Sequence, residues 1–306
     1  GCTLGDISGS TNSTITEEDL QATSQILGES LSSDNSGIFL SIRDALTTIS
    51  SSGFSSPAAK SANSWDQTQT DHNGIGNESN YQYAYDAETG IHTISFERQV
   101  QRTLFQKSVT DTLNYLYRDN NGNFIEFPRQ QEEQIESIAY NGRREGQLST
   151  LRKESFFTRK DTLLVNGVSN TSQTLNIDGV HNGNGTVTIE PSSGNTIERS
   201  YELEINFLNI EIQKSQSGEI NVERGVSGTL SWEMTIDKTT RQGSDSKTIR
   251  GTIELSGDGT ALLRFENLLK LFQVNINDGD VKDQDEEFEG RVTSVSTSQQ
   301  SVTLFN

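Results

Sequence analysis

Sulfur is almost absent from this chain. Its 306 residues include one cysteine, Cys2, and one methionine. A single thiol cannot form an intramolecular disulfide, so other interactions must hold the fold together. Because Cys2 lies at the very start of the sequence, it is also a poor candidate for a buried nucleophile.

Proline and long apolar runs are scarce as well. The chain has three prolines, which argues against a long disordered linker. It has no run of about 20 apolar residues, so no helix of this sequence is predicted to span a bilayer. Apolar residues make up only 30% of the chain, yet they recur in regular patterns. This combination predicts a large polar surface over a thin core, as in an extended or strongly curved sheet.

Positive charge is in short supply. The chain has 43 acidic and 24 basic residues, for a formal net charge of −19. That balance disfavours nucleic acid as a partner and direct adhesion to anionic lipid headgroups. Basic residues do concentrate between positions 98 and 160. We prefer to interpret them as residues on the solvent-exposed faces of strands. A binding site for an anionic partner is the alternative. The basic residues in question include Arg143, Arg144, Arg152, Lys153, Arg159 and Lys160.

The N-terminal segment favours a membrane anchor. Gly1-Cys2 resembles the junction at which bacterial lipoproteins are processed, a small residue directly before the acylated cysteine. In its general style, a tethered cysteine before a chain rich in Ser, Thr and Asn, the sequence resembles outer-membrane lipoproteins of the Bacteroidetes type. The resemblance implies a signal peptide, fatty acylation such as palmitate on Cys2, and a place in the bacterial cell envelope. Residues 3–14 are mostly small or polar, as expected of a flexible tether. Thr3, rather than an aspartate, follows Cys2, which permits the outer membrane, on its periplasmic or exposed side. The alternative is an incidental cysteine.

Residues 15–80 are predicted to form a helical hairpin followed by a polar loop. Thr16 and the acids at 17–19 are typical of a helix N-terminus. Apolar residues then recur at helical spacing up to Leu31 and again from Ile38. The polar stretch that follows contains Trp65 as its one large anchor.

From Tyr81 onward the apolar period changes to two, and residues 81–306 are predicted to form one antiparallel β domain. Short turn signals such as NGNG at 182–185 and GDG at 257–259 separate the alternating runs. We expect a meander of about ten to fourteen strands. The alternation changes parity near Leu208-Asn209, which indicates a β-bulge. Residues 266–272 offer the one short helical turn.

Two architectures fit this pattern. The first, which we favour, is a mainly β fold in which one large curved meander sheet forms an open half-barrel and holds the N-terminal helices in its concavity. The second is a pair of β-sandwiches divided near residues 160–175. No proline-rich or low-complexity linker marks such a division.

No catalytic motif occurs. The three histidines, His72, His92 and His181, are isolated, with no HxH or HExxH spacing. The sequence also lacks a nucleophile elbow, a P-loop and a dinucleotide-binding loop. Its many carboxylates mostly share the polar parity of the strands. We therefore expect a protein that is not an enzyme.

Two weaker candidate sites remain. Asp278, Asp280, Asp283 and Asp285 crowd an acidic segment that favours a solvated loop, with weak binding of Ca²⁺ as the alternative, although the EF-hand order of ligands is not met. Tyr81, Tyr83 and Tyr85 lie on one strand face, with Trp65 nearby in sequence. They fit amphipathic residues at the edge of a core, or a surface on which a sugar ring stacks.

Three functions follow, in order of preference. The first is a non-catalytic, membrane-anchored binding or scaffold module with an envelope protein or a glycan as partner. The second is a lipid or lipoprotein carrier with an apolar concave face, and the third is a carbohydrate-active enzyme. A carrier needs an unfilled apolar cavity, whereas a scaffold should have its concavity filled by the helices, including Ile26, Leu27, Leu31, Ile38, Phe39 and Ile42. An enzyme would need two buried carboxylates in a cleft.

Overall fold

The structure is a computed structural model. It describes residues 15–50, 53–55, 78–169, 171–190, 196–215, 220–240, 243–284, 291–296 and 301–305. The predicted tether at 1–14, with Cys2, lies outside the described residues. So do His72, Trp65 and Asp285.

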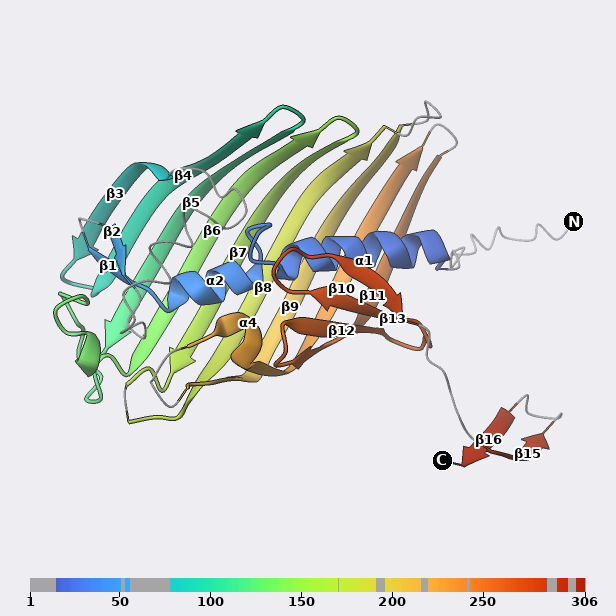
Figure 1. The fold of residues 1–306 in the computed structure, drawn as a ribbon. Helices are drawn as coiled ribbons and strands as arrows, with labels where there is room; N and C mark the ends of the chain where they lie inside the picture. The colour runs from blue at the N-terminus through green and yellow to red at the C-terminus, as the bar shows by residue number, and fades with distance from the viewer. Residues whose placement is uncertain are drawn as a thin grey trace, which may run out of the picture.

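Twelve antiparallel strands form one open sheet, in which each strand pairs with the next strand along the chain (Figure 1). This arrangement confirms the predicted meander, and the alternative of two sandwiches is wrong. Clean apolar alternation explains it, because each strand buries one face and the short turns allow only neighbouring strands to pair. The strands are β3 (Glu78–Asp86), β4 (Ile91–Arg102), β5 (Phe105–Arg118), β6 (Ser137–Thr150), β7 (Lys153–Asn166), β8 (Thr174–Ile189), β9 (Ile197–Gln213), β10 (Val226–Thr240), β11 (Gly243–Ser256), β12 (Thr260–Phe265), β13 (Leu271–Asn275) and β14 (Val281–Gln284).

The remaining elements are short, apart from the first helix. Two small hairpins flank the main sheet in sequence, one before it and one after it. These elements are α1 (Glu17–Leu31), α2 (Ile38–Ala45), β1 (Thr48–Ser50), β2 (Gly53–Ser55), η1 (Glu132–Gln134), α4 (Val222–Gly225), β15 (Arg291–Ser296) and β16 (Ser301–Phe305).

Helix α1 begins where the sequence predicts. The Thr16 hydroxyl accepts a hydrogen bond from the Asp19 amide at 3.3 Å, and the Asp19 carboxylate accepts one from the Thr16 amide at 2.8 Å. This reciprocal capping box satisfies two donors that the first helical turn leaves free.

Helices α1 and α2 follow one another across the concave side of the sheet, instead of folding back on each other as a hairpin would (Figure 1). The link between them explains the difference. The Ser33 amide donates to the Ile276 carbonyl at 3.1 Å, and the Asp34 amide donates to the Asn277 carbonyl at 2.9 Å. The link is therefore bound to the chain between β13 and β14, and each helix packs its apolar side on the sheet.

The helices fill the concavity of the sheet. Leu27, Leu31, Ile38, Phe39 and Ile42 are all fully buried and belong to one continuous apolar cluster with the inward side chains of the strands. Complete burial of such a side chain stabilises the fold by roughly 1.5–3 kcal/mol. Together they make the helices part of the core.

Aromatic rings lie over glycines on the inner face of the sheet. Gly185 is paired across the strands with Tyr201, and Gly251 with Trp232. A Cβ at position 251 would clash with the Arg264 carbonyl oxygen and lie 2.7 Å from the Trp232 ring. One at position 185 would clash with the Phe156 carbonyl oxygen and lie 3.0 Å from the Tyr201 ring. Each glycine therefore leaves room for the backbone of a neighbouring strand and for the ring of its cross-strand partner, which also protects the glycine backbone.

Two local expectations have opposite outcomes. The predicted bulge near Leu208-Asn209 is confirmed, since Asn209 has a φ of 54° and the register of β9 shifts against both β8 and β10. The helical turn expected at 266–272 is wrong. Strand β13 begins at Leu271, because Phe272 and Val274 alternate into the core and are buried as strand residues.

Candidate functional site

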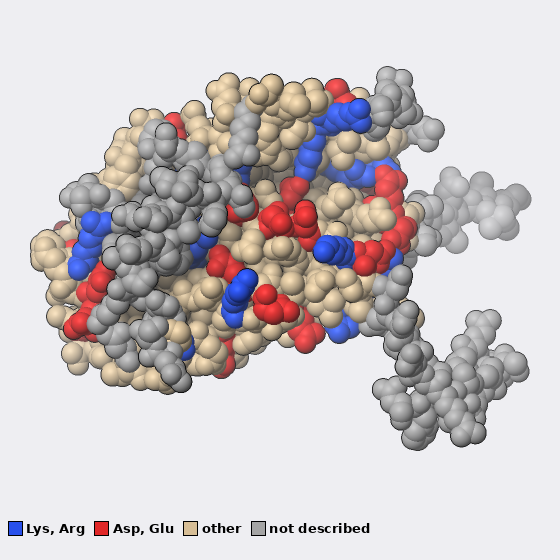
Figure 2. Space-filling view, in the orientation of Figure 1, with Lys and Arg blue, Asp and Glu red and all other residues tan. Residues whose placement is uncertain are grey.

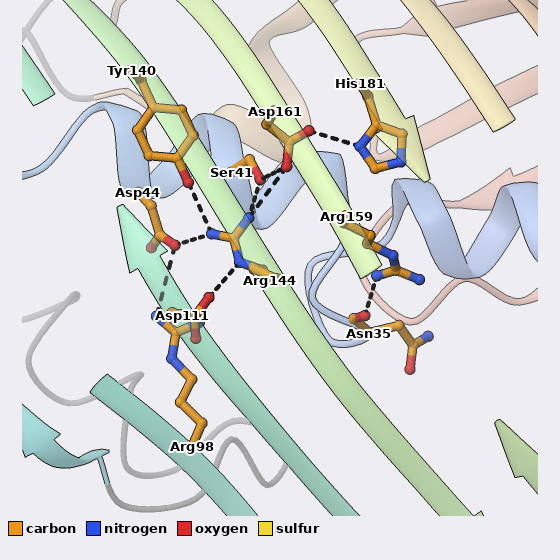
Figure 3. Close-up of polar contacts among 10 residues, drawn as sticks. All are labelled: Asn35, Ser41, Asp44, Arg98, Asp111, Tyr140, Arg144, Arg159, Asp161 and His181. Carbon is orange, nitrogen blue, oxygen red and sulfur yellow. Dashed lines mark hydrogen bonds and ion pairs between the residues drawn. The ribbon is translucent and has the colours of Figure 1, made fainter. Parts of the chain in front are cut away.

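Charged side chains gather in the interior, between α2 and the sheet (Figure 3). At their centre is Arg144 of β6, whose side chain is fully buried. Its Nε lies 2.8 Å from Asp111 Oδ1 and its Nη1 lies 3.5 Å from Asp161 Oδ2, while Nη2 pairs with the Asp44 carboxylate. Three strands and one helix therefore meet at a single guanidinium group.

Hydrogen bonds extend this cluster. Tyr140 Oη accepts from Arg144 Nη2 at 3.1 Å, and Ser41 Oγ donates to Asp161 Oδ2 at 2.6 Å. A second guanidinium group, that of Arg98, lies 3.7 Å from Asp44. The complete set is Ser41, Asp44, Arg98, Asp111, Tyr140, Arg144, Asp161 and His181, which we call the buried ionic cluster.

Sequence reasoning missed this cluster, although a signal for it is present. Arg144 continues the inward parity of Ile138 and Tyr140, and Asp161 has the inward parity of Leu163 and Val165. A charged residue at an apolar position of a strand must find a partner inside the protein. Several such residues on successive strands of one sheet therefore predict an internal cluster.

The pKa values in the cluster reflect burial and pairing. Burial alone would raise the pKa of Asp161, but His181, Arg144 and Ser41 outweigh it and lower the pKa below its usual value. Burial raises the pKa of Tyr140 and is the largest effect on that phenol. Burial opposes the charge of Arg144, yet Tyr140 and the three aspartates raise its pKa overall. The aspartate and the arginine are thus held in their charged forms.

The cluster contains serine, aspartate and histidine, but not in the order of a catalytic triad. Asp161 lies between the other two, since its Oδ1 is 2.7 Å from His181 Nδ1 and its Oδ2 binds the Ser41 hydroxyl. A triad needs the histidine next to the hydroxyl, as the base that takes its proton. All three side chains are buried. This arrangement orients α2 on the sheet.

Ion pairs at the rim of the concavity attach α1 in the same way. Glu18 pairs with Arg199 at 2.5 Å and with Lys238 at 2.7 Å, and Asp19 pairs with Lys247 at 2.6 Å. In Figure 2 acidic and basic side chains alternate over this side of the molecule. The inward bases of the sheet therefore meet acids of the protein's own helices.

The basic stretch at 98–160 divides between the two faces of the sheet. Arg144 and Arg159 are buried, while Arg143 and Lys160 are exposed. The interpretation as solvated strand faces is therefore wrong for the inward residues. Their partners are internal, because the residues have the inward parity of their strands.

Two of these inward bases bind the link between the helices. Lys107 Nζ donates to the Asp34 carbonyl at 2.6 Å, and Arg159 Nη1 donates to the Asn35 carbonyl at 2.5 Å. Burial, followed by the nearby charges of Arg159 and Arg98, lowers the pKa of Lys107 to about 7. The link is thus fixed from one side by two cations.

The tyrosines of β3 contact other aromatic rings of the protein. Tyr83 Oη lies 3.0 Å from His92 Nδ1, the Tyr85 and His92 rings are 4.5 Å apart, and Tyr81 stacks on Phe96 at 6.4 Å. All three tyrosines are half-buried. Their contacts match residues at the edge of a core, and stacking on a sugar stays a prediction.

The acidic segment packs against the link between the helices. Asp278 Oδ1 accepts from the Asp280 amide at 2.9 Å, and the Asp278 carbonyl accepts from Asn35 Nδ2 at 2.8 Å. Asp283 pairs with Lys270. No group of three or more His, Cys, Asp or Glu side chains that could hold a metal ion occurs in the part of the chain that the structure describes. Binding of Ca²⁺ here stays a prediction.

The outer face of the sheet carries three adjoining hollows. Their volumes are about 690, 560 and 230 Å³. The largest shares Asn184 and Glu202 with the second, and Ser108 and Gln147 with the third. They therefore form one shallow outer-face groove, which extends from β4 to β11.

Comparison with protein-family models finds no match. Neither the curated proteins nor the solved structures contain a match to this chain. Among the helices of the described residues, none has the length and apolar character needed to cross a membrane.

Proposed function

We propose that this protein is a non-catalytic binding or scaffold module of the bacterial cell envelope, anchored by lipid at Cys2. The observation that carries the proposal is the filled concavity. Two helices occupy the inner face of the sheet, and their apolar side chains are fully buried there. The protein would act through the surface that a large, rigid sheet displays.

The filled concavity argues against the lipid carrier. A carrier holds its ligand in an open apolar cavity, whereas all three hollows named above lie on the outer face and are lined mostly by polar side chains. The helices would have to leave the sheet before a lipid could enter. Their removal would break the pairing of Arg144 with Asp44 inside the protein.

The distribution of carboxylates argues against the glycosidase. Asp111 and Asp161 are buried, but they pair with Arg144 beneath α2 and have no access to a substrate. Glu145 and Glu202 line the outer-face groove, but they are exposed to solvent. A glycosidase needs a pair of carboxyl groups that face each other across a cleft open to the substrate. One of the two must also have its pKa raised by burial.

The anchor is tested by comparing the native protein with the variant Cys2→Ser. We expect the native protein in the membrane fraction, with a lipid-sized mass increment on its N-terminal peptide, and the variant in the soluble fraction. An unmodified Cys2 in the native protein would refute the anchor.

The carrier is tested on the same soluble variant by native mass spectrometry and solvent extraction. A scaffold with a filled concavity should carry no lipid held without a covalent bond. A stoichiometric bound lipid would favour the carrier instead.

A further inference from the structure

We propose that the outer-face groove binds an extended, uncharged polysaccharide chain that lies across the strands. This inference rests on the proposed function and specifies its ligand class. It is carried by the arrangement of the side chains that line the groove, together with their charge.

The groove contains a row of side chains that crosses seven strands by direct pairing. Successive cross-strand partners from β4 to β10 form it, and each belongs to the outer face. Strands lie about 4.8 Å apart, so a groove that crosses the eight strands from β4 to β11 extends about 34 Å. The row consists of Gln99, Ser108, Gln147, Phe156, Thr186, Ser200 and Asp237.

The chemistry of this row matches a chain of hydroxyl groups. Amide and hydroxyl side chains both donate and accept hydrogen bonds, as sugar hydroxyls do. They repeat at the strand spacing, which suits a ligand with a similar group at each step. A compact ligand would use one end of so long a row, whereas an extended polymer can use all of it.

An apolar platform lies at the middle of the row. Phe156 is 47% exposed, so part of its ring is open to a ligand. It lines the largest hollow, beside Gln147 and Thr186. A ring in this position can stack on the C–H face of a sugar ring, while the polar neighbours bind its hydroxyl groups.

The charge of the groove selects against acidic polymers. Two cations line the three hollows, and both have partners in the protein: Lys107 binds the Asp34 carbonyl inside, and Arg250 pairs with Glu233. Carboxylates such as Glu145 and Glu202 add negative charge. A polysaccharide of uronic acids would be repelled, and a neutral one would not.

The test is titration calorimetry on the full chain with the substitution Cys2→Ser, using neutral hexasaccharides of glucose, mannose and xylose, and an alginate hexasaccharide as the acidic probe. We expect at least one neutral probe to bind and alginate not to bind. The substitution Phe156→Ala should weaken binding about tenfold, equivalent to ~1.4 kcal/mol.

Leu164→Ala is the matched control. Leu164 lies on the same strand and the same face and is 43% exposed, but it is outside the three hollows. It should leave the dissociation constant unchanged. Absence of binding by every neutral probe at millimolar concentration, preference for alginate, or equal effects of the two substitutions would overturn the proposal. The anchor and carrier tests separate this failure from failure of the proposed function. If Cys2 is lipid-modified and the protein holds no non-covalent lipid, the anchored binding or scaffold module is retained and only its glycan ligand is rejected.

Discussion

The substitution Arg144→Met tests whether the buried ionic cluster holds α2 on the sheet. Methionine keeps much of the length of the side chain but removes the cation that faces Asp44, Asp111 and Asp161. Removal of one partner from a buried ionic network typically lowers the free energy of unfolding by about 3–5 kcal/mol, because the opposite charges stay buried without compensation. In a chain of this size we expect a fall in Tm of roughly 5–8 °C.

The adjacent residue provides the control. Arg143 points to the outer face and pairs with Glu145, and both side chains are about half exposed. Arg143→Met should change the free energy of unfolding by less than about 1 kcal/mol, as expected of a surface ion pair. Urea unfolding at pH 7, followed by tryptophan fluorescence and by circular dichroism, measures both variants.

A pH series makes this test sharper. The pKa of Asp161 is lowered in the native protein, so its contribution to stability is present above the unfolded pKa near 4 and is lost as the pH falls through the folded value. Without Arg144, Asp161 loses one of the charges that lower its pKa while burial still raises that pKa, so the variant should regain stability relative to the native protein as Asp161 takes up a proton. The gap between the two proteins should therefore narrow from pH 7 to pH 5. Equal stability of the Arg144→Met and Arg143→Met variants at pH 7 would refute the structural role of the cluster.

Three further predictions concern packing and charge. Because the pKa of Lys107 is about 7, the unfolded chain binds more protons at this residue than the folded chain does between pH 7 and 10. Lys107 should therefore make the free energy of unfolding rise with pH in that window, by an amount on the order of 2–4 kcal/mol, and Lys107→Met should remove this part of the rise in urea titrations. Leu27→Ala should lower the free energy of unfolding by about 2–5 kcal/mol through the cavity it leaves, whereas Leu269→Ala, at an 80% exposed position, should change it by less than about 0.5 kcal/mol. Gly251→Ala places a Cβ against the Arg264 carbonyl oxygen and 2.7 Å from the Trp232 ring, and should cost at least about 1–3 kcal/mol. The near-ultraviolet circular dichroism spectrum should also change. An unchanged spectrum and stability would argue against this close packing around Gly251.

Alternation along the chain was enough to predict the sheet. Leu230, Trp232 and Met234 bury one face of β10, and the intervening polar residues leave the other face in water. Where every strand repeats this pattern and only short turns connect them, an antiparallel meander is the simplest arrangement that buries all the apolar faces. The capping residues at Thr16 and the change of parity at Asn209 are local signals of the same kind, and both are confirmed.

The interior charges were harder to predict, because their partners are distant in sequence. Ser41 and Asp161 are 120 positions apart, and no local pattern joins them. The path of the chain after α1 was equally hidden. It depends on backbone hydrogen bonds from Ser33 and Asp34 to the segment before β14. Every residue other than proline has the same backbone amide, so the residue type does not indicate which carbonyl that amide binds. The acidic segment shows the same limit. Its aspartates suggest a Ca²⁺ site in the sequence, whereas its packing on Asn35 is a contact between residues far apart in the chain.

Hydrogen exchange measured by mass spectrometry tests the filled concavity most directly. If α1 and α2 are part of the core, their amides should exchange as slowly as those of the central strands β7 to β9, in the native protein at neutral pH. Rapid exchange confined to the two helices, with the strands still protected, would show that the helices leave the sheet, and would contradict a scaffold whose inner face is permanently filled.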